Sequence, residues 1–381
     1  MKIGLVSPYD WNYPGGVRDH IRHLAEQFIR KGHEIRILAP VSGKQSRIPE
    51  QYLYPMGWTT PIPFNGSIAR ITCDPTLPAR LGTVLQQECF DILHVHEPLV
   101  PGLSLAALHC SRTLTIGTFH AYAPSRMSSI PYLAYTSASG LLLPYFRRLN
   151  GHIAISNVAK QFVSQAFPAD YSVIPNGVNL DRFSPSLVPW PYLMDGKQNI
   201  LFLGRFEKRK GACYLLRALP AIRKQHPHTR FLFVGEGRYR QRLQHFVQQQ
   251  KWYDVLFTGT VSDEDVPRYF ASAHIFCAPA IGNESMGIVL LEAMASGTAV
   301  VASNIPGYAS VVTSGTDGLL TTPCNSQELA GAVNLLLTNE SQRQRLIQAG
   351  LQKAREYAWP QVASRILDYY SHANSYVKRE H

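Results

Sequence analysis

Short apolar runs alternate with stretches of helical periodicity along both halves of the chain. Residues 3–6 and 35–40 are apolar runs, and between them Val17, Ile21 and Phe28 recur at helical spacing with polar residues in the gaps. A strand, a helix and a second strand in this order form a βαβ unit, which implies a parallel sheet. Further strand-like runs in this half occupy residues 91–96, 115–120 and 152–156.

The same alternation starts again in the second half. Strand-like runs there occupy residues 199–204, 229–235, 255–259, 275–279 and 299–303, and helical stretches begin near residues 211 and 326. Between the two series, residues 184–197 are rich in proline, which is typical of a linker. The pattern predicts an α/β protein with two doubly wound domains joined near residues 175–197. Because ligands collect at the carboxyl ends of parallel strands, we expect the site in a cleft between two facing domains.

Composition agrees with two folded domains and leaves the partner open. The 381 residues exceed what one core usually organises, and 45% of them are hydrophobic. The net charge of +11, from 37 Lys and Arg against 26 Asp and Glu, attracts anions such as nucleotides, nucleic acid or acidic lipids, or serves solubility alone. The cations are scattered, with neither an aromatic-basic RNA signature nor zinc-finger spacing, so we do not expect nucleic acid as the partner.

The cysteine spacing and the lack of long apolar runs in the sequence indicate in which cellular compartment the protein acts. The closest two of the six cysteines are sixteen residues apart, which excludes CxxC zinc ribbons and redox dithiols and favours a reducing, cytoplasmic setting. The N-terminus reaches a polar turn too early for a secretory signal. No apolar run approaches the roughly 18–20 residues that span a bilayer. We therefore expect any membrane contact to be peripheral.

The strongest local signal is a pair of glutamates, Glu284 and Glu292, eight residues apart around the start of a predicted helix. Gly287 would let a ligand approach the backbone, and the free N–H groups of Ile288 and Val289 with the helix dipole would form a phosphate site. The carboxylates would bind hydroxyls of the donor sugar and of a ribose. The alternative, a helix cap and a solvated face, explains Glu292 poorly because it lies in an apolar stretch where an unpartnered charge is costly.

Two cations form the second signal. Arg205 follows directly after a predicted strand, and Lys210 lies at the entry to the next helix. As a glycosidic bond to a diphosphate breaks, negative charge develops on phosphate oxygens, and fixed cations stabilise it without a metal. A solvated basic face made of Lys208, Arg209 and Lys210 remains an equal alternative when this segment is taken alone.

These motifs, in this order along the whole chain, resemble the retaining GT-B glycosyltransferases of family four. The chain is most similar to the bacterial phosphatidyl-myo-inositol mannosyltransferases in the segments MKIGLVSPYDWNYPGGV, PIPFNGSIAR, FDILHVHEP, IPNGV, FLGRFEKRKG and NESMGIVLLEAMASGTAVVAS. The resemblance implies the GT-B fold, with two Rossmann-like domains that face a central cleft. Residues 1–180 would bind the acceptor and residues 181–358 the nucleotide sugar, while a C-terminal helix of about 359–381 would pack back on the first domain.

The resemblance also implies the donor site and the catalytic residues. Gly16, at the first helix N-terminus, would lie against the donor phosphate, where a side chain would block the approach. Arg205 and Lys210 would hold the diphosphate, Glu284 the donor sugar and Glu292 the ribose. The catalytic residues would be Arg205, Lys210, Glu284 and His120. No metal would take part.

The acceptor site would lie in the first domain. His120, at the end of a predicted strand, would line the reaction centre, although a strand-end histidine by itself is more often structural. Tyr9, Asn65, Ser67 and Arg70 match positions that shape the acceptor site.

The implied reaction transfers an α-mannosyl residue from GDP-mannose to a phosphatidylinositol-type lipid at the cytoplasmic membrane surface. The chain departs from the family pattern at the acceptor phosphate, where Ser125 and then Arg126 replace a lysine, so Arg126 takes this acceptor-binding role here. It also departs at residues 77–88, a basic membrane-docking helix in the family, which here contains Arg80 as its only cation. The alternative is a family-four enzyme that uses UDP-glucose or another nucleotide sugar on a diacylglycerol-type lipid or a soluble or polysaccharide acceptor.

One acidic triplet resembles a metal motif. Asp263, Glu264 and Asp265 match the D-x-D pattern with which other glycosyltransferases hold a metal. The triplet precedes VPRYF, which favours acids in the first turn of a helix, and no histidine or cysteine supplements the pair. We therefore expect no metal here and a nucleotide sugar as the only co-substrate.

Overall fold

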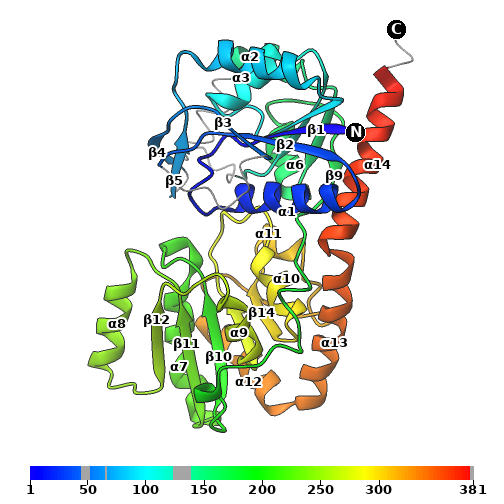
Figure 1. Cartoon of the computed structure of the whole chain (residues 1–381). Coiled ribbons are helices and arrows are strands. Elements are labelled where there is room, and N and C mark those ends of the chain that lie inside the picture. The colour runs from blue at the N-terminus through cyan, green and yellow to red at the C-terminus, as the bar shows by residue number, and fades with distance from the viewer. Residues whose placement is uncertain (44–51, 65–66, 123–138, 378–381) are drawn as a thin grey trace. The chain divides into compact units, whose positions relative to one another are not determined.

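The computed structural model describes residues 1–43, 52–64, 67–122 and 139–377. The chain divides into two compact units, Met1–Asn176 with Trp359–His381 as unit 1, and Gly177–Ala358 as unit 2. The sequence predicts that the first domain ends at residue 180, and in the structure the first segment of unit 1 ends at Asn176. Each unit contains its own parallel sheet with helices around it (Figure 1).

The sheet of unit 1 is parallel throughout and reverses its strand order at β1. In spatial order its strands are β3 (Leu53–Pro55), β2 (Glu34–Ala39), β1 (Lys2–Val6), β6 (Ile92–His96), β7 (Leu114–Phe119), β8 (Gly151–Ala154) and β9 (Ser172–Val173). The five strands predicted for this half are confirmed. The pattern missed β3, β9 and a separate antiparallel hairpin of β4 (Thr60–Phe64) and β5 (Ser67–Ile71).

The helices of unit 1 include the C-terminal helix of the chain. They are α1 (Gly16–Arg30), α2 (Leu77–Glu88), α3 (Leu103–Cys110), α5 (Ser139–Phe146), α6 (Asn157–Ser164) and α14 (Trp359–Val377). Helix α14 packs beside α1, since Ile366 and Tyr370 share one buried core with Ile3, Ile21 and Phe28 (Figure 1). Burying one such side chain stabilises the fold by about 1.5–3 kcal/mol, so this contact fixes α14 on unit 1.

Unit 2 repeats the doubly wound plan. Its strands, in spatial order, are β12 (Val255–Gly259), β11 (Thr229–Val234), β10 (Gln198–Leu203), β13 (Ile275–Ala278), β14 (Ala299–Ser303) and β15 (Leu319–Thr321), all in parallel pairs. Its helices are α7 (Ala212–Gln225), α8 (Arg240–Gln249), α9 (Val266–Ala271), α10 (Ile288–Ala295), α11 (Pro306–Ala309), α12 (Ser326–Thr338) and α13 (Glu340–Glu356). The five predicted strands are confirmed, and the short β15 was missed.

The proline-rich segment is packed rather than free, which corrects its interpretation as a mere linker. Residues 191–193 form a 3₁₀ turn, and Leu193 is fully buried. The Trp190 ring lies 3.6 Å from the guanidinium carbon of Arg268, and its backbone N–H donates to Ser272 Oγ at 2.8 Å. Apolar and aromatic side chains between the prolines thus anchor the segment on α9. In the described residues no helix has the length and apolar character needed to cross a membrane.

Candidate functional site

In unit 2 the predicted donor residues follow the two strands where the sheet order reverses. β10 leads directly into Gly204 and Arg205, and β13 leads into the loop that contains Glu284. The two loops touch at Gly211, which has a φ of +71° and whose added Cβ would lie 1.8 Å from the carbonyl oxygen of Pro279. Only glycine fits such a contact. Ligands of doubly wound sheets bind at this reversal, so the fold brings both signals to a ligand-binding edge.

The charged side chains of these loops form one continuous network. Glu284 Oε1 forms salt bridges with Lys210 Nζ at 2.7 Å and with an Arg209 nitrogen at 2.5 Å. Glu207 forms salt bridges with Arg209 Nε at 2.8 Å and with an Arg205 nitrogen at 2.9 Å. The network contains three cations and two carboxylates, so it retains a positive charge at the end of β10. The Arg205 side chain is 52% exposed, against 19% for Lys210, which makes Arg205 the more open cation.

Arg209 and Glu207 were missed as site residues by the sequence reasoning. The basic run was open to the alternative of a solvated face, and only Lys208 is exposed. Residues 208–210 form a 3₁₀ turn, and the long side chains of Arg209 and Lys210 both reach Glu284 from it.

The turn before α10 is closely packed. Gly287 precedes the helix, and Ile288 and Val289 form its half-buried first turn, where backbone N–H groups lack partners within the helix. An added Cβ at Gly287 would lie 2.6 Å from Leu290 Cδ1 and 2.9 Å from Tyr308 Cδ1. A larger residue at position 287 would therefore have to displace Leu290 or Tyr308, independently of any ligand.

The two glutamates of the predicted pair lie on both sides of this turn. The Glu284 carbonyl would be 2.0 Å from a Cβ at Gly307, so α11 holds its backbone in place. Burial, and to a smaller extent the charge of Glu284, raises the pKa of the Tyr308 phenol well above its ordinary value. Glu292 lies in α10 and is half-buried between fully buried neighbours.

In unit 1 the early glycine turn forms an open helix N-terminus. Gly15 is extended and gives α1 no side-chain cap, and Gly16 is the first residue of the helix. A Cβ added at either position meets nothing within 4 Å. Uncapped N–H groups with open space in front of them are suited to bind an anion.

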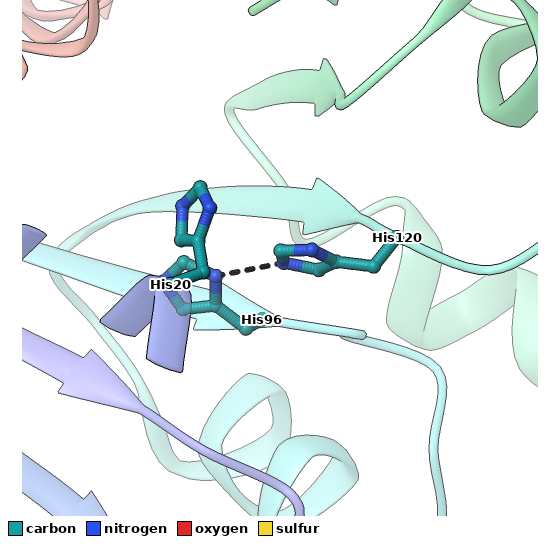
Figure 2. A group of neighbouring side chains, drawn as sticks. All are labelled: His20, His96 and His120. Atoms are coloured by element: carbon teal, nitrogen blue, oxygen red, sulfur yellow. Dashed lines mark hydrogen bonds between the residues drawn. The ribbon is translucent and has the colours of Figure 1, made fainter. Parts of the chain in front are cut away.

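His120 follows β7 and lies in a cluster of buried histidines (Figure 2). Its Nε2 is 3.1 Å from His96 Nδ1, and its backbone N–H donates to Glu97 Oε1 at 2.7 Å. Burial and the neighbouring imidazoles lower the pKa of His120 well below its ordinary value, so its ring is neutral near pH 7. Burial raises the pKa of Glu97 to about 7. The hydrogen bonds from the backbone of His120 and Ala121 lower this pKa but do not offset the effect of burial.

The histidine cluster is also the one group in the described ranges that could hold a metal ion. Ligand atoms of His20, His96 and His120 all lie within 4.8 Å of one another. Three imidazoles are a donor set that Zn²⁺ accepts. The acidic triplet is not such a group among the described residues, and it lies in the turn before α9 rather than in its first turn, because the helix begins at Val266.

The predicted acceptor residues are only partly described. Tyr9 forms an isolated bridge to Ile71 of β5, and the Arg70 guanidinium carbon lies 3.9 Å above the Tyr13 ring. Ser67 is the first residue of β5, but its side chain is outside the described residues. Asn65, Ser125 and Arg126 also lie outside the described residues.

Comparison with known proteins gives consistent matches for both units. A model of "Glycosyltransferase Family 4" matches residues 14–182, and a model of "Glycosyl transferases group 1" matches residues 191–353. Phosphatidyl-myo-inositol mannosyltransferase of Mycobacterium leprae is 39% identical over 376 residues, 97% of this chain and 96% of that protein. The enzyme of the same name from Mycobacterium tuberculosis is 37% identical over 378 residues, with 97% and 96% covered.

Solved structures agree on the fold. A glycosyltransferase from Rickettsia africae superposes with a TM-score of 0.76 at 19% identity and 98% coverage of both chains. Anabaena HepE, solved with UDP and glucose, gives a TM-score of 0.76 at 20% identity, with 98% of this chain and 100% of that chain covered. The expected GT-B fold is thus confirmed.

Proposed function

Because the chain belongs to the family of phosphatidyl-myo-inositol mannosyltransferases, glycosyltransferases with the GT-B fold, we propose that it transfers an α-mannosyl residue from GDP-mannose to a phosphatidylinositol-type lipid. The observation that carries the proposal is the near-complete coverage of relatives with that name at 34–39% identity. The cationic network at the end of β10 agrees with a diphosphate leaving group.

The donor is assigned to unit 2. Arg205 and Lys210 bind the diphosphate, together with the free N–H groups at Ile288 and Val289. Glu284 binds hydroxyls of the mannose, and Glu292 binds the ribose. Glu284 is suited to this because its salt bridges with Arg209 and Lys210 both use Oε1, and a carboxylate has a second oxygen that can accept hydrogen bonds.

The lipid acceptor is assigned to unit 1, where His120, Tyr9 and Arg70 contact it, with Asn65, Ser67 and Arg126 completing the proposed acceptor site. Gly16 at the start of α1 leaves room for a donor phosphate. An acceptor hydroxyl attacks the anomeric carbon on the face from which the diphosphate departs, and the departing phosphate oxygen takes the hydroxyl proton. The new glycosidic bond therefore keeps the α configuration of the donor.

The cations of unit 2 supply the electrostatic part of catalysis. As the bond from anomeric carbon to oxygen breaks, a negative charge grows on the diphosphate, and Arg205 and Lys210 stabilise that charge. Each such group contributes about 2–4 kcal/mol to the transition state, by analogy with other preorganised donors. No metal is needed in this scheme.

The enzyme acts at the inner face of the cytoplasmic membrane, which it meets peripherally. Helix α2 contributes little electrostatic attraction, because its single cation Arg80 is already paired with Asp74 at 3.3 Å and donates to the Pro55 carbonyl at 3.1 Å. The net charge of +11 from the rest of the chain supplies the attraction to anionic lipid.

Purified full-length enzyme incubated with GDP-mannose and phosphatidylinositol vesicles tests the proposal, with mass spectrometry of the lipid extract as the readout. We expect a product heavier by one hexose, formed equally well with a chelator present. UDP-glucose with diacylglycerol vesicles serves as the parallel arm. A hexose-bearing product in that arm alone would replace the proposal with the alternative donor and acceptor.

A further inference from the structure

We propose that His96 is a positioning residue, which holds His120 in the tautomer with the proton on Nδ1, so that His120 offers an N–H to the substrate. The inference rests on the proposed function, since it takes His120 to contact the substrate. It adds the chemical role of that contact: His120 acts as a hydrogen-bond donor, and the departing phosphate remains the base.

Strand register places the two rings together. β6 and β7 are parallel neighbours with His96 opposite Thr118, and His120 lies two positions beyond Thr118. Side chains two positions apart along an extended chain point to the same side, so His120 lies diagonally next to His96. The centres of the two rings are 5.3 Å apart, and His120 Nε2 is 3.1 Å from His96 Nδ1 (Figure 2).

His20 of α1 closes the third side of the cluster. Its ring centre lies 4.9 Å from that of His120, and the ring planes are 86° apart, an edge-on contact. The His20 ring is itself fixed, because its Nδ1 lies 2.6 Å from Asn176 Oδ1 and Trp359 packs against it. An amide oxygen only accepts, so His20 carries its proton on Nδ1 and presents an unprotonated Nε2 to the cluster.

The burial of His96 decides which of the two rings, His96 or His120, donates the hydrogen bond between them. His96 is fully buried, and its Nε2 has no partner in the described parts of the chain. If His120 donated, the neutral His96 ring would carry its own proton on that Nε2, a buried N–H without an acceptor, which folded proteins rarely contain. If His96 donates from Nδ1, its Nε2 is a bare acceptor and His120 carries its proton on Nδ1. The second arrangement is the one we adopt.

All members of the cluster are neutral near pH 7. Burial, together with the adjacent imidazoles, lowers the pKa of His96 and His120 well below the ordinary value, and burial lowers that of His20 to about 4. The hydrogen bond between His96 and His120 therefore joins two neutral rings, and each ring has one tautomer.

A metal ion at the cluster is the competing explanation. A metal on His120 Nε2 and His96 Nδ1 would take both nitrogens of the existing hydrogen bond. The His96 proton would then have to lie on the partnerless Nε2, whereas ligating histidines nearly always donate their other N–H to an acceptor. The pairing of the rings therefore favours positioning over a metal bound through these two nitrogens.

His96→Leu and His96→Asn separate positioning from a merely structural role. Leucine cannot bond to His120, whereas the amide of asparagine lies near the position of His96 Nδ1 and can donate the same hydrogen bond. We expect His96→Leu to lower kcat about 10- to 100-fold with little change in the KM for GDP-mannose. His96→Asn restores most of the lost kcat.

His94→Leu is the matched control. His94 lies on the same strand and is equally buried, but its nitrogens bond to Thr118 Oγ1 and Tyr370 Oη, each at 2.6 Å, rather than to His120. The His94 ring also packs on His96, with ring centres 4.2 Å apart, and leucine keeps an apolar side chain at that place. This variant loses stability but leaves the hydrogen bond between His96 and His120 in place, so its kcat per folded molecule stays at the wild-type value. An equal kcat loss in His94→Leu and His96→Leu would overturn the proposal.

Nuclear magnetic resonance of full-length enzyme with ¹⁵N-labelled histidine reads the tautomer directly, without any substrate. The proposal expects the His120 proton on Nδ1 in the wild type and a mixture of tautomers in His96→Leu. A proton on Nε2 in the wild type would overturn it, as would one tightly bound metal ion per purified chain that is lost in His20→Leu. If the wild type transfers no mannose, the proposed function fails, while the resonance experiment still decides the pairing.

Discussion

Replacing Glu284 by glutamine tests the core of the proposed donor site. One carboxylate oxygen of Glu284 forms salt bridges with both Lys210 and Arg209, and the Glu284 side chain is 12% exposed. Glutamine keeps the shape and removes the charge. Arg209 keeps its second partner, Glu207, whereas Lys210 loses the carboxylate that it contacts at 2.7 Å.

Two free energies follow from this geometry. A hydrogen bond to a charged group contributes about 1.5–3 kcal/mol, and partial exposure of the cations reduces this, so unfolding should become easier by about 1–2 kcal/mol. The loss of charge-assisted bonds to the mannose costs the transition state about 2–4 kcal/mol. That range corresponds to a kcat about 30- to 1,000-fold lower. GDP, which lacks the sugar, should still bind.

Asp317→Asn is the control for stability. Asp317 is a buried carboxylate of the same unit, paired with Lys353 at 2.5 Å and bonded to the Thr313 N–H at 2.8 Å, and it is not part of the proposed site. Thermal unfolding and mannose transfer are measured on both variants. Transfer at the wild-type rate in Glu284→Gln, or an equal loss of transfer in Asp317→Asn, would refute the reasoning.

Three further predictions concern pH, the open helix end and metals. Folding raises the pKa of Glu97 from 4.5 to about 7, so the contribution of this one group to stability is complete below pH 4.5 and falls by about 3 kcal/mol as the pH rises to 7; the difference in stability between the wild type and Glu97→Gln, measured by melting curves across this range, should follow that slope, and a difference independent of pH would contradict it. Gly16→Val should fold normally because its Cβ enters open space, yet calorimetry should detect weakened GDP-mannose binding, and unchanged affinity would contradict the assignment. Enzyme stripped with a chelator should keep its transfer rate, whereas a loss restored by Mg²⁺ or Mn²⁺ would show that the cations do not replace a metal.

The main strands were predictable because both faces of a parallel sheet are covered. A strand such as β13, with the sequence IFCA, is buried along its whole length and so appears as an unbroken apolar run. The hairpin of β4 and β5 was missed because Pro61 and Pro63 interrupt β4, and proline is rare inside strands. The role of Trp190 was missed as well, since its contact with Arg268 joins positions 78 residues apart.

The placement of the candidate residues was predictable where it depends on strand ends and less so where it depends on tertiary contacts. Arg205 and Glu284 follow strands, and their position at the ligand-binding edge is a consequence of topology. Arg209 was not distinguishable from its basic neighbours, because a single turn has no periodicity that marks an inward side chain. The pairing of His96 with His120 had a usable signal, since both end neighbouring predicted strands, but only the register of β6 and β7 makes them partners.

The two units differ in how their candidate residues are charged, and the proposed reaction explains the difference. Negative charge develops on the departing diphosphate, so permanent cations are useful at the end of β10. A protonated histidine cluster would place buried positive charge next to a hydroxyl that His120 only has to orient. Burial prevents this by holding His96 and His120 neutral, which leaves His120 able to offer a hydrogen bond without carrying a charge. A buried carboxylate in place of His96 would reverse that arrangement, because it would favour a charged His120.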